Sequence, residues 1–443
     1  MKTGVWSGRR VAVWGAAKSG VAAANLLVEL GARVVLSDSR PLAELEVAGL
    51  DERVALRGGG NVLDGAEVLV PSPGIKPGTP AIIEAVRSGV RLMGEVELAA
   101  SVAVAPMVAI GGTDGKSTTT EMIGACVRAA GRPVVVAGNI GDPLSARVRD
   151  VGADGVVVAE ISAFQLWSCQ RFAPQVAVIT NIADDHADYF GGDFERYAAA
   201  KLRMLEDMAP GATAVLRAED PRVGPAWLPP GVRRVVFAAQ PMQRGFGVRG
   251  GALTWDDRPL MGVASLPVAG RHNHANALAA LAAGVALGLP VGSMIEGLRG
   301  FRGLPHRLER VRVRRGVVWY DDSKATNPHA AAVGLRSLGA VGKVVITGGY
   351  DKGVSLDPFV AALDGVRHLV VTGDTAARVA AAVGDRVPVS VAGDMREAVA
   401  IAARVARAGE VVVLSPAASS FDRYRSYAHR GEVFAGEVRA LDE

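Results

Sequence analysis

A lysine and four hydroxyl-bearing residues directly follow a glycine-rich turn in the segment GGTDGKSTTT, residues 111–120. The turn consists of Gly112, Thr113, Asp114 and Gly115. Such small or turn-forming residues let backbone N–H groups close around phosphate oxygens at the start of a helix. Lys116 would reach the β- and γ-phosphates of a nucleoside triphosphate, and the Ser117 hydroxyl would ligate Mg²⁺. Ile110 stands where the strict phosphate-loop pattern has glycine, so the loop is a variant, and the alternative is a turn that binds nothing.

Two residues that could ligate a metal follow strand-like runs near this loop. Glu160 ends the apolar run DGVVVAE, and His186 lies in NIADDHAD, just after the next run. Because the carboxyl ends of parallel strands meet at one edge of a sheet, both side chains are expected beside the phosphate loop. Glu160 would then be the acid that supports Mg²⁺. A lone histidine there is more often a capping or surface residue. Because Glu160 and Ser117 are expected at the same edge, we interpret His186 as a metal ligand.

A second phosphate-binding signature, VAVWGAAKSG, occupies residues 11–20. Ala17 replaces the middle glycine of the dinucleotide pattern G-x-G-x-x-G, the glycine that lets backbone approach a pyrophosphate. Asp38, at the end of the next strand-like run, would bind a ribose in an NAD-dependent dehydrogenase. That class of enzyme is the alternative, although nothing downstream resembles a hydride-transfer site. A chain that binds two phosphorylated molecules is expected to consume one of them in a reaction with the other, or in a reaction that joins two molecules.

The segments that must position these residues alternate between strand-like and helix-like sequence. Residues 10–40 read as strand, glycine turn, helix and strand, and residues 66–75 add a buried strand. Val-rich strand runs follow the phosphate loop, with short strands expected over 211–270 and a helix over 273–289. Beyond the linker GLPHRLE, residues 303–309, five strands with polar exits indicate a third sheet. This rhythm predicts an α/β protein whose parallel sheets are covered by helices.

Composition narrows the class of protein further. With 49% hydrophobic residues, 21% charged residues and a net charge of +4 without a basic run, we expect a soluble protein that binds no nucleic acid. Cys126 and Cys169 lie in apolar surroundings, which predicts unreactive core thiols and a reducing compartment. Residues 275–295 carry no charge but are rich in Ala and Gly and contain Pro290, so we expect a buried helix and no membrane insertion. The N-terminus shows no export signal, so a cytoplasmic protein is expected.

Five motifs in sequence resemble the Mur ligases, which build the peptide of bacterial peptidoglycan while consuming ATP. The motifs are GTDGKST (112–118), AEISAFQL (159–166), TNIADDHADYF (180–190), GRHNHANALAA (270–280) and GLPHRLE (303–309). The resemblance covers essentially the whole chain. It implies three domains, which are an N-terminal Rossmann-like UDP-binding domain (1–98), a central P-loop ATPase-like domain (99–302) and a C-terminal Rossmann-like amino-acid-binding domain (303–443).

The C-terminal segments resemble the family member that adds D-glutamate to UDP-N-acetylmuramoyl-L-alanine. These segments are YDDSKATNP (320–328), GGYDKG (348–353) and LSPAASSFDRYRSYAHRGEVF (414–434). The resemblance implies that the alanyl carboxylate attacks the γ-phosphoryl group of ATP to form an acyl phosphate, from which the D-glutamate amine displaces phosphate. The alternatives are another Mur ligase, or a ligase like folylpolyglutamate synthetase, which lacks a UDP-binding first domain.

The resemblance also assigns residues to ATP and the metal. The implied catalytic residues are Lys116, Glu160, His186 and Lys201. The ATP site adds Thr118, Asn273, Asn276 and Arg307 to residues 112–117. Ser117, Glu160, His186 and Lys201 would hold two Mg²⁺ ions. An ammonium group cannot ligate Mg²⁺, but in the family this lysine is carbamylated, which supplies the hard oxygen ligands that Mg²⁺ prefers. Periodicity alone would make Lys201 an ordinary lysine on a solvated helix face.

The two remaining substrates are assigned in the same way. The UDP-sugar residues are Ser19, Gly20, Asp38, Ser39, Arg40, Ser72, Pro73, Gly74 and Asn139, of which Asn139 would touch the muramoyl-alanine end. The D-glutamate residues are Lys324, Thr326, Lys352, Ser420, Phe421 and Tyr427. The third domain is expected to swing on a linker near residues 300–305 when nucleotide binds. A monomer acting on small molecules is expected.

Overall fold

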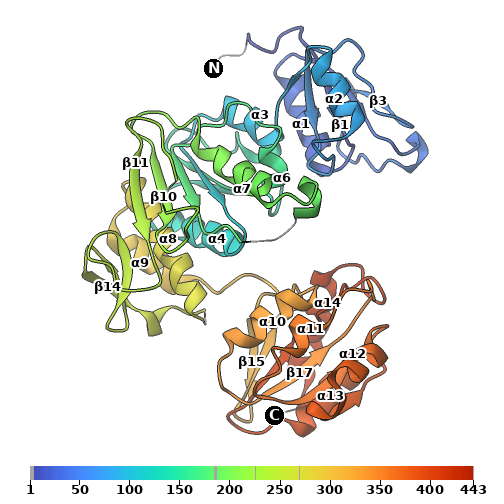
Figure 1. Ribbon diagram of the computed structural model, residues 1–443, viewed down its shortest axis with the longest axis vertical. Helices are drawn as coiled ribbons and strands as arrows, with labels where there is room; N and C mark the ends of the chain where they lie inside the picture. The colour runs from blue at the N-terminus through green and yellow to red at the C-terminus, as the bar shows by residue number, and fades with distance from the viewer. Residues whose placement is uncertain (1–3, 184–186, 225, 269, 443) are drawn as a thin grey trace. The chain divides into compact units, whose positions relative to one another are not determined.

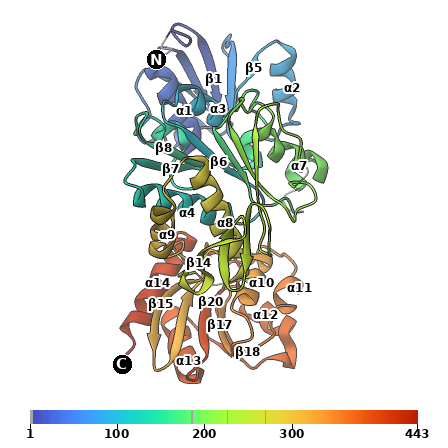
Figure 2. The same cartoon turned by 90° about the vertical axis from the view of Figure 1, so that its left-hand side faces the viewer.

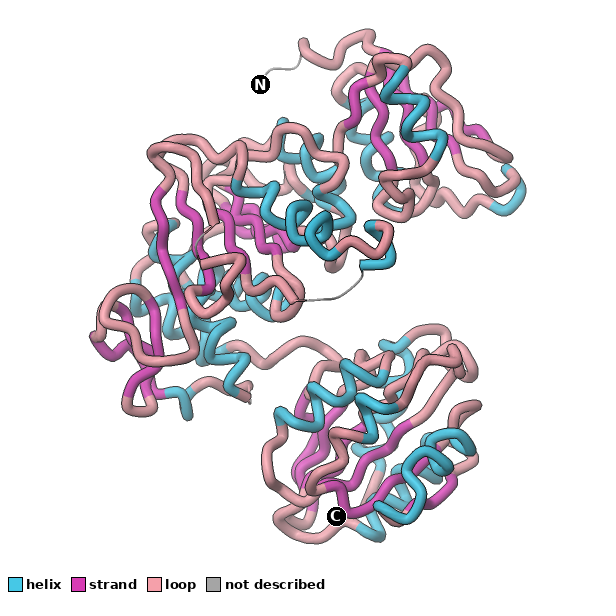
Figure 3. The backbone as a smooth tube through the Cα atoms, in the orientation of Figure 1, coloured by secondary structure: helices cyan, strands magenta, loops and turns pink. Residues whose placement is uncertain are grey.

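Three β-sheets organise the chain in the computed structural model, which describes residues 4–183, 187–224, 226–268 and 270–442 (Figure 1). The first two sheets belong to one compact unit, Met1–Leu266 with His272–Phe301. The third sheet belongs to a second unit, Arg302–Glu443 with the short segment Pro267–Arg271. Helices flank the strands within each unit (Figure 3). The predicted α/β class is confirmed, whereas the domain limits at 98/99 and 302/303 stay predictions.

The first sheet is parallel and has the strand order β3-β2-β1-β4-β5. Its apolar strands are buried on both faces, as the Val-rich runs predicted. The short strands β3 and β5 at its two edges were not predicted. The elements are β1 (Arg10–Trp14), α1 (Lys18–Glu29), β2 (Arg33–Ser37), η1 (Leu42–Glu44), β3 (Ala55–Arg57), β4 (Val68–Pro71), α2 (Pro80–Arg87) and β5 (Arg91–Leu92).

The central sheet has the strand order β14-β13-β12-β11-β10-β9-β6-β8-β7. Strands β7, β8, β6, β9, β10 and β11 are adjacent in this order and pair in parallel. The antiparallel pairs β12–β13 and β13–β14 form one edge of the sheet, within the region predicted to hold short strands. Strands are β6 (Met107–Gly111), β7 (Val134–Gly138), β8 (Val156–Glu160), β9 (Val176–Ile179), β10 (Thr213–Arg217), β11 (Arg233–Phe237), β12 (Phe246–Arg249), β13 (Ala252–Trp255) and β14 (Arg258–Gly262). Helices are α3 (Glu95–Val102), α4 (Lys116–Ala129), α5 (Leu144–Arg147), α6 (Ala163–Leu166), η2 (Ala187–Phe190), α7 (Phe194–Leu202), η3 (Arg203–Leu205), η4 (Val263–Ser265), α8 (Arg271–Ala286) and α9 (Val291–Gly300).

The uncharged segment 275–295 forms most of α8 and the start of α9, two helices labelled in Figure 2. Pro290 is the N-cap residue of α9. The middle of α8 is buried, which confirms the predicted core helix. Among the described residues, no helix is both long and apolar enough to cross a membrane. Cys126 and Cys169 are free and buried as expected, and burial raises the pKa of Cys126 to about 12.

The third sheet has the strand order β15-β16-β20-β17-β18-β19, with six strands where five were predicted. The additional strand is β15, which pairs antiparallel with β16 and begins at Glu309, inside the predicted linker. Its sequence, ERVRVR, is rich in charged residues, as is common in edge strands. The elements are β15 (Glu309–Arg314), β16 (Val317–Asp321), α10 (Pro328–Ser337), β17 (Lys343–Thr347), α11 (Asp357–Val360), β18 (Val366–Val371), α12 (Ala376–Val383), η5 (Gly384–Arg386), β19 (Val389–Val391), α13 (Met395–Val405), β20 (Val411–Leu414) and α14 (Tyr427–Ala440).

Candidate active site

The predicted phosphate loop connects β6 to α4. Gly112 and Gly115 adopt φ values of +133° and +78°, which L side chains rarely adopt. The backbone therefore turns sharply over residues 113–115 before α4 begins at Lys116. Ser117 is buried in the first turn of this helix. The Lys116 Nζ donates to the Thr113 carbonyl oxygen at 2.7 Å, so the ammonium lies over the loop. The loop and the helix N-terminus thus have the geometry of an anion cradle.

Two residues at the end of β9 brace the loop. Thr180 Oγ1 donates to the Asp114 carbonyl oxygen at 2.6 Å, and Asn181 Oδ1 accepts from the Asp114 N–H at 2.8 Å. The Asn181 amide also donates to the Asp114 carboxylate. Neither residue was singled out from the sequence, although both open the motif TNIADDHADYF. Their roles depend on β9 pairing directly with β6, which a single sequence does not reveal.

Glu160 lies at the carboxyl edge of the same sheet, in register with Ile110 at the end of the phosphate-loop strand. It is 1% exposed, and its Oε1 accepts from Asn139 Nδ2 at 2.7 Å. Its buried Oε2 has no hydrogen-bond partner among the described residues. A buried carboxylate oxygen without a partner suits a bound cation, so Glu160 fits the predicted Mg²⁺ site. His186 lies outside the described residues.

Lys201 is buried on α7, with 3% of its surface exposed. The Nζ lies 2.5 Å from the carbonyl oxygen of Gly112 and 4.4 Å from the centre of the Tyr197 ring. The reading as a solvated helix lysine is therefore wrong. Burial against the phosphate loop brings Lys201 to the part of the protein that the family resemblance predicted.

Helix α8 brings Asn276 to the other side of the loop. Its Oδ1 accepts from Thr119 at 3.3 Å, and its Nδ2 donates to Asn273 at 3.1 Å. A Cβ atom on Gly115 would lie 2.4 Å from Asn276 Oδ1, so the loop and α8 are in close contact. Both asparagines thus lie near the start of α4, where Thr118 also lies. Arg307 belongs to the second unit.

The predicted UDP-sugar residues of the first sheet follow the carboxyl ends of β1, β2 and β4. Asp38 accepts from the Ala16 N–H at 2.8 Å and forms a 3.0 Å ion pair with Arg40. The Arg40 hydrogen bond is the main cause of a strongly lowered Asp38 pKa. The Asp38 carboxylate is thus engaged within the loop, whereas half of the Arg40 side chain is exposed.

The remaining predicted UDP-sugar residues come from α1, the β2 exit and the β4 exit. Ser19 and Gly20 open α1, Ser39 is exposed after β2, and Ser72, Pro73 and Gly74 follow β4. The Tyr189 hydroxyl contacts the carbonyl oxygens of Pro73 and Ile75 at 2.8 and 2.7 Å. Asn139 instead follows β7 and contacts Glu160, so it lies in the central sheet beside the phosphate loop.

The third sheet has a cavity of about 100 Å³ at the exits of its strands. Two of the six predicted D-glutamate residues, Thr326 and Lys352, line it. Lys324 lies with its Nζ 5.1 Å from the Tyr427 ring centre. Ser420 is buried next to the lining residue Ser419, and Phe421 is 69% exposed. Sequence reasoning missed the other lining residues, among which Tyr350, Asp351, Thr375 and Arg378 carry polar or charged side chains.

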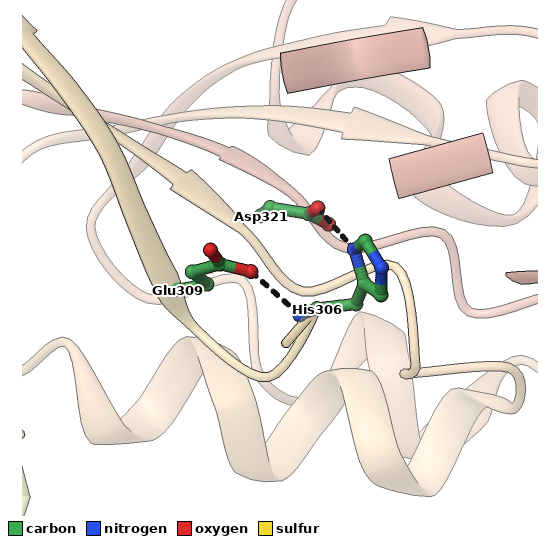
Figure 4. Close-up of side chains that lie close together, drawn as sticks. All are labelled: His306, Glu309 and Asp321. Carbon is green, nitrogen blue, oxygen red and sulfur yellow. Dashed lines mark hydrogen bonds and ion pairs between the residues drawn. The ribbon is translucent and has the colours of Figure 1, made fainter. Parts of the chain in front are cut away.

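His306 ties the predicted linker to the exit of β16. Its Nδ1 lies 2.7 Å from Asp321 Oδ2, and its N–H donates to Glu309 (Figure 4). Its carbonyl oxygen accepts from the Lys324 N–H. The side chains of His306, Glu309 and Asp321 could supply metal ligands. However, the histidine and Asp321 already satisfy each other. The arrangement therefore positions Lys324 rather than offering an open ligand set.

The fold and the site together define a nucleotide-phosphate-binding α/β protein with three sheets. Family models match most of the chain, described as Mur ligase MurD-like, N-terminal domain (residues 9–94), Mur ligase middle domain (110–284) and Mur ligase, glutamate ligase domain (306–418). The chain belongs to the Mur ligase family, whose members are ATP-dependent enzymes that form amide bonds.

Similar proteins span the full length of the chain. UDP-N-acetylmuramoylalanine–D-glutamate ligases from Syntrophotalea carbinolica and Pelotomaculum thermopropionicum are each 40% identical, with 98% of both chains covered. Among solved structures, UDP-N-acetylmuramate-alanine ligase from Thermotoga maritima shares 18% identity at a TM-score of 0.61, covering 98% of this chain and 99% of that one. The MurF ligase from Thermotoga maritima in complex with ADP shares 18% identity at a TM-score of 0.60, covering 99% and 97%. These two likenesses concern the fold.

Proposed function

We propose that this enzyme adds D-glutamate to UDP-N-acetylmuramoyl-L-alanine, consuming one ATP for each amide bond. The observation that carries the proposal is 40% identity, over 98% of both chains, to ligases named for this reaction. The site supports it, because a phosphate loop, a buried carboxylate and a buried lysine meet at one edge of the central sheet. The first and third sheets offer separate sites for the other two substrates.

The reaction has two balanced steps. A carboxylate oxygen of the alanyl group attacks the γ-phosphorus of ATP, the bond to the β-phosphate oxygen breaks, and ADP leaves. The amine of D-glutamate then attacks the carbonyl carbon of the acyl phosphate, the C–O bond to phosphate breaks, and the amine loses a proton. Activation is needed because hydroxide is a poor leaving group from an unactivated acid.

The chain's own residues stabilise the charge that gathers in the first step. Lys116 and the loop N–H groups face the phosphates, where fixed positive groups lower the barrier without reorganising. Ser117, Glu160 and His186 would hold Mg²⁺, which neutralises phosphate charge when bound. Asn139 orients Glu160 through the 2.7 Å hydrogen bond and keeps its second oxygen available.

Lys201 would act as a carbamate. A carbamylated Nζ carries two oxygens beside Gly112 and would complement Glu160 as a second anionic ligand. Native intact-mass analysis should find the mass of one added CO₂, lost on acidification and absent in Lys201→Ala. A bare amine in active protein would refute this part of the proposal.

Phosphate release measured with a panel of amino acids tests the function. D-Glutamate should support turnover together with the UDP-sugar and ATP, whereas L-glutamate, L-alanine and diaminopimelate should not. Turnover with another amino acid in place of D-glutamate would assign the enzyme to another branch of the family. The reaction is proposed to take place in the cytoplasm, on a monomer.

A further inference from the structure

The cavity of the third sheet holds a second cation besides Lys352. Arg378, the third residue of α12, lines the cavity together with Lys352 and Asp351. Its guanidinium group contacts both ends of the loop 351–354. One terminal nitrogen lies 2.7 Å from Asp351 Oδ1, and the other donates to the Val354 carbonyl oxygen at 2.8 Å. The same Asp351 oxygen accepts from the Gly353 N–H at 2.8 Å. Arg378 therefore holds both ends of the loop that carries Lys352.

The start of α12 is attached to this loop at a second point. The Gly349 N–H donates to Thr375 Oγ1 at 3.0 Å, and the Thr375 N–H donates to the Gly349 carbonyl oxygen at 3.0 Å. Thr375 and Arg378 are three residues apart, so they lie on one face of the helix end. Together they fasten the exit of β17 from Gly349 to Val354.

This arrangement is poorly explained by stability alone. The side chains of Arg378 and Asp351 are 36% and 31% exposed, and ion pairs at such sites contribute little to folding. The buried Arg378 Nε has no hydrogen-bond partner among the described residues. The two contacts of Arg378 with the loop therefore form at the cost of one unsatisfied donor. Ala417, which also lines the cavity, has a φ of +56°, a strained conformation of the kind found at functional sites.

We propose that Arg378 is a positioning residue of the amino-acid site: it fixes the loop 351–354 so that Lys352 presents its ammonium to a carboxylate of the amino-acid substrate. The inference rests on the proposed function for the identity of that substrate. Two anionic groups on one small molecule need cations at set positions, and an exposed lysine on an untethered loop would lose rotamer and backbone freedom on binding. The tether supplies that order in advance.

The test compares Arg378→Ala and Arg378→Lys with Arg367→Ala in the full-length enzyme. Arg367 is a matched control, because it also joins a carboxylate, Glu410, and a backbone carbonyl, that of Val405, at the opposite edge of the same sheet. We expect Arg378→Ala to raise the KM for D-glutamate at least about tenfold, as loss of a charged hydrogen bond would. We expect kcat and the KM for ATP to change less than about twofold. Arg378→Lys should restore part of the loss.

Asp351→Asn and Arg378→Ala form a double-mutant cycle. The KM of the double variant for D-glutamate should be no higher than that of the more impaired single variant. Additive losses, or a KM increase for Arg378→Ala no larger than for Arg367→Ala, would overturn the proposal. So would an equal rise in the KM for ATP. The wild-type amino-acid panel judges the proposed function separately: if another amino acid is the substrate, the same KM comparison is made with that amino acid.

Discussion

Lys116, Glu160 and Lys201 come from three segments of the chain, and each is brought to the phosphate loop by a different constraint. Lys116 opens α4, Glu160 ends the strand beside the loop strand, and Lys201 is buried on α7 against Gly112. Residue type alone suggested the first two. The third was recognised only through family resemblance, because one lysine on a helix carries no signal of what covers it.

Replacing Lys116 by alanine should remove a cation from the phosphate loop. We expect the rate of ATP-dependent ligation to fall by roughly 10² or more, as for other charge-stabilising groups. Binding of the UDP-sugar should be unchanged. The control is Arg128→Ala in the last turn of the same helix, which breaks a surface ion pair with Glu121. A Lys116→Ala enzyme that keeps its rate would show that the loop lysine does not take part.

Asp322 predicts a pH dependence of stability. Burial raises its pKa from 3.8 to about 7, although it accepts from the Leu308 N–H and the Ser415 hydroxyl. Because the folded pKa lies above the unfolded one, folding favours the protonated acid. The stabilising contribution is therefore fully present below about pH 4 and is lost as the pH rises through 7.

Asp322→Asn keeps the shape and removes the titration. Between pH 5 and 8, the wild-type free energy of unfolding should fall relative to that of the variant by on the order of 2–3 kcal/mol. Urea unfolding at both pH values measures this difference. Parallel pH profiles for the two proteins would show that Asp322 does not titrate in this range.

At the scale of elements, the contact between the phosphate loop and α8 predicts a specific effect of Gly115→Ala. The added Cβ would lie 2.4 Å from Asn276 Oδ1 at a φ of +78°. Gly131→Ala is the control, because Gly131 has a similar φ of +72° and nothing within 4 Å of the added atom. Calorimetry should show ADP binding weakened about tenfold or more by the first change and unchanged by the second. Equal losses would mean that backbone strain alone is responsible.

Much of the architecture could be predicted from the sequence, since buried parallel strands read as Val-rich runs and glycine turns mark their exits. Strands β7 and β15 were missed for different reasons. β7 is a short apolar run, VVVAG, which periodicity alone cannot distinguish from part of a buried helix, and in β15 four of the six residues are charged. Contacts across the sheet, such as Asn139 with Glu160 and Asn181 with Asp114, could not be predicted, because they depend on the strand order β9-β6-β8-β7.

At the scale of the whole molecule, the proposed reaction assigns one part of the chemistry to each sheet. The central sheet has the phosphate loop, the first has the exits of β1, β2 and β4, and the third has a cavity with Lys352 and Arg378. All three sites lie at the carboxyl edge of a mostly parallel sheet, where the loops that follow the strands can bind ligands. The proposed reaction therefore requires that the γ-phosphoryl group of ATP be transferred to a carboxylate of another substrate and not to water.

Isotope transfer tests this requirement most directly. UDP-N-acetylmuramoyl-L-alanine labelled with ¹⁸O in both alanyl carboxylate oxygens is incubated with ATP, Mg²⁺ and D-glutamate, and the released phosphate is examined by mass spectrometry. If the carboxylate attacks the γ-phosphorus, each phosphate carries one ¹⁸O atom. Phosphate without ¹⁸O, formed at the rate of ligation, would contradict an acyl phosphate and with it the central claim.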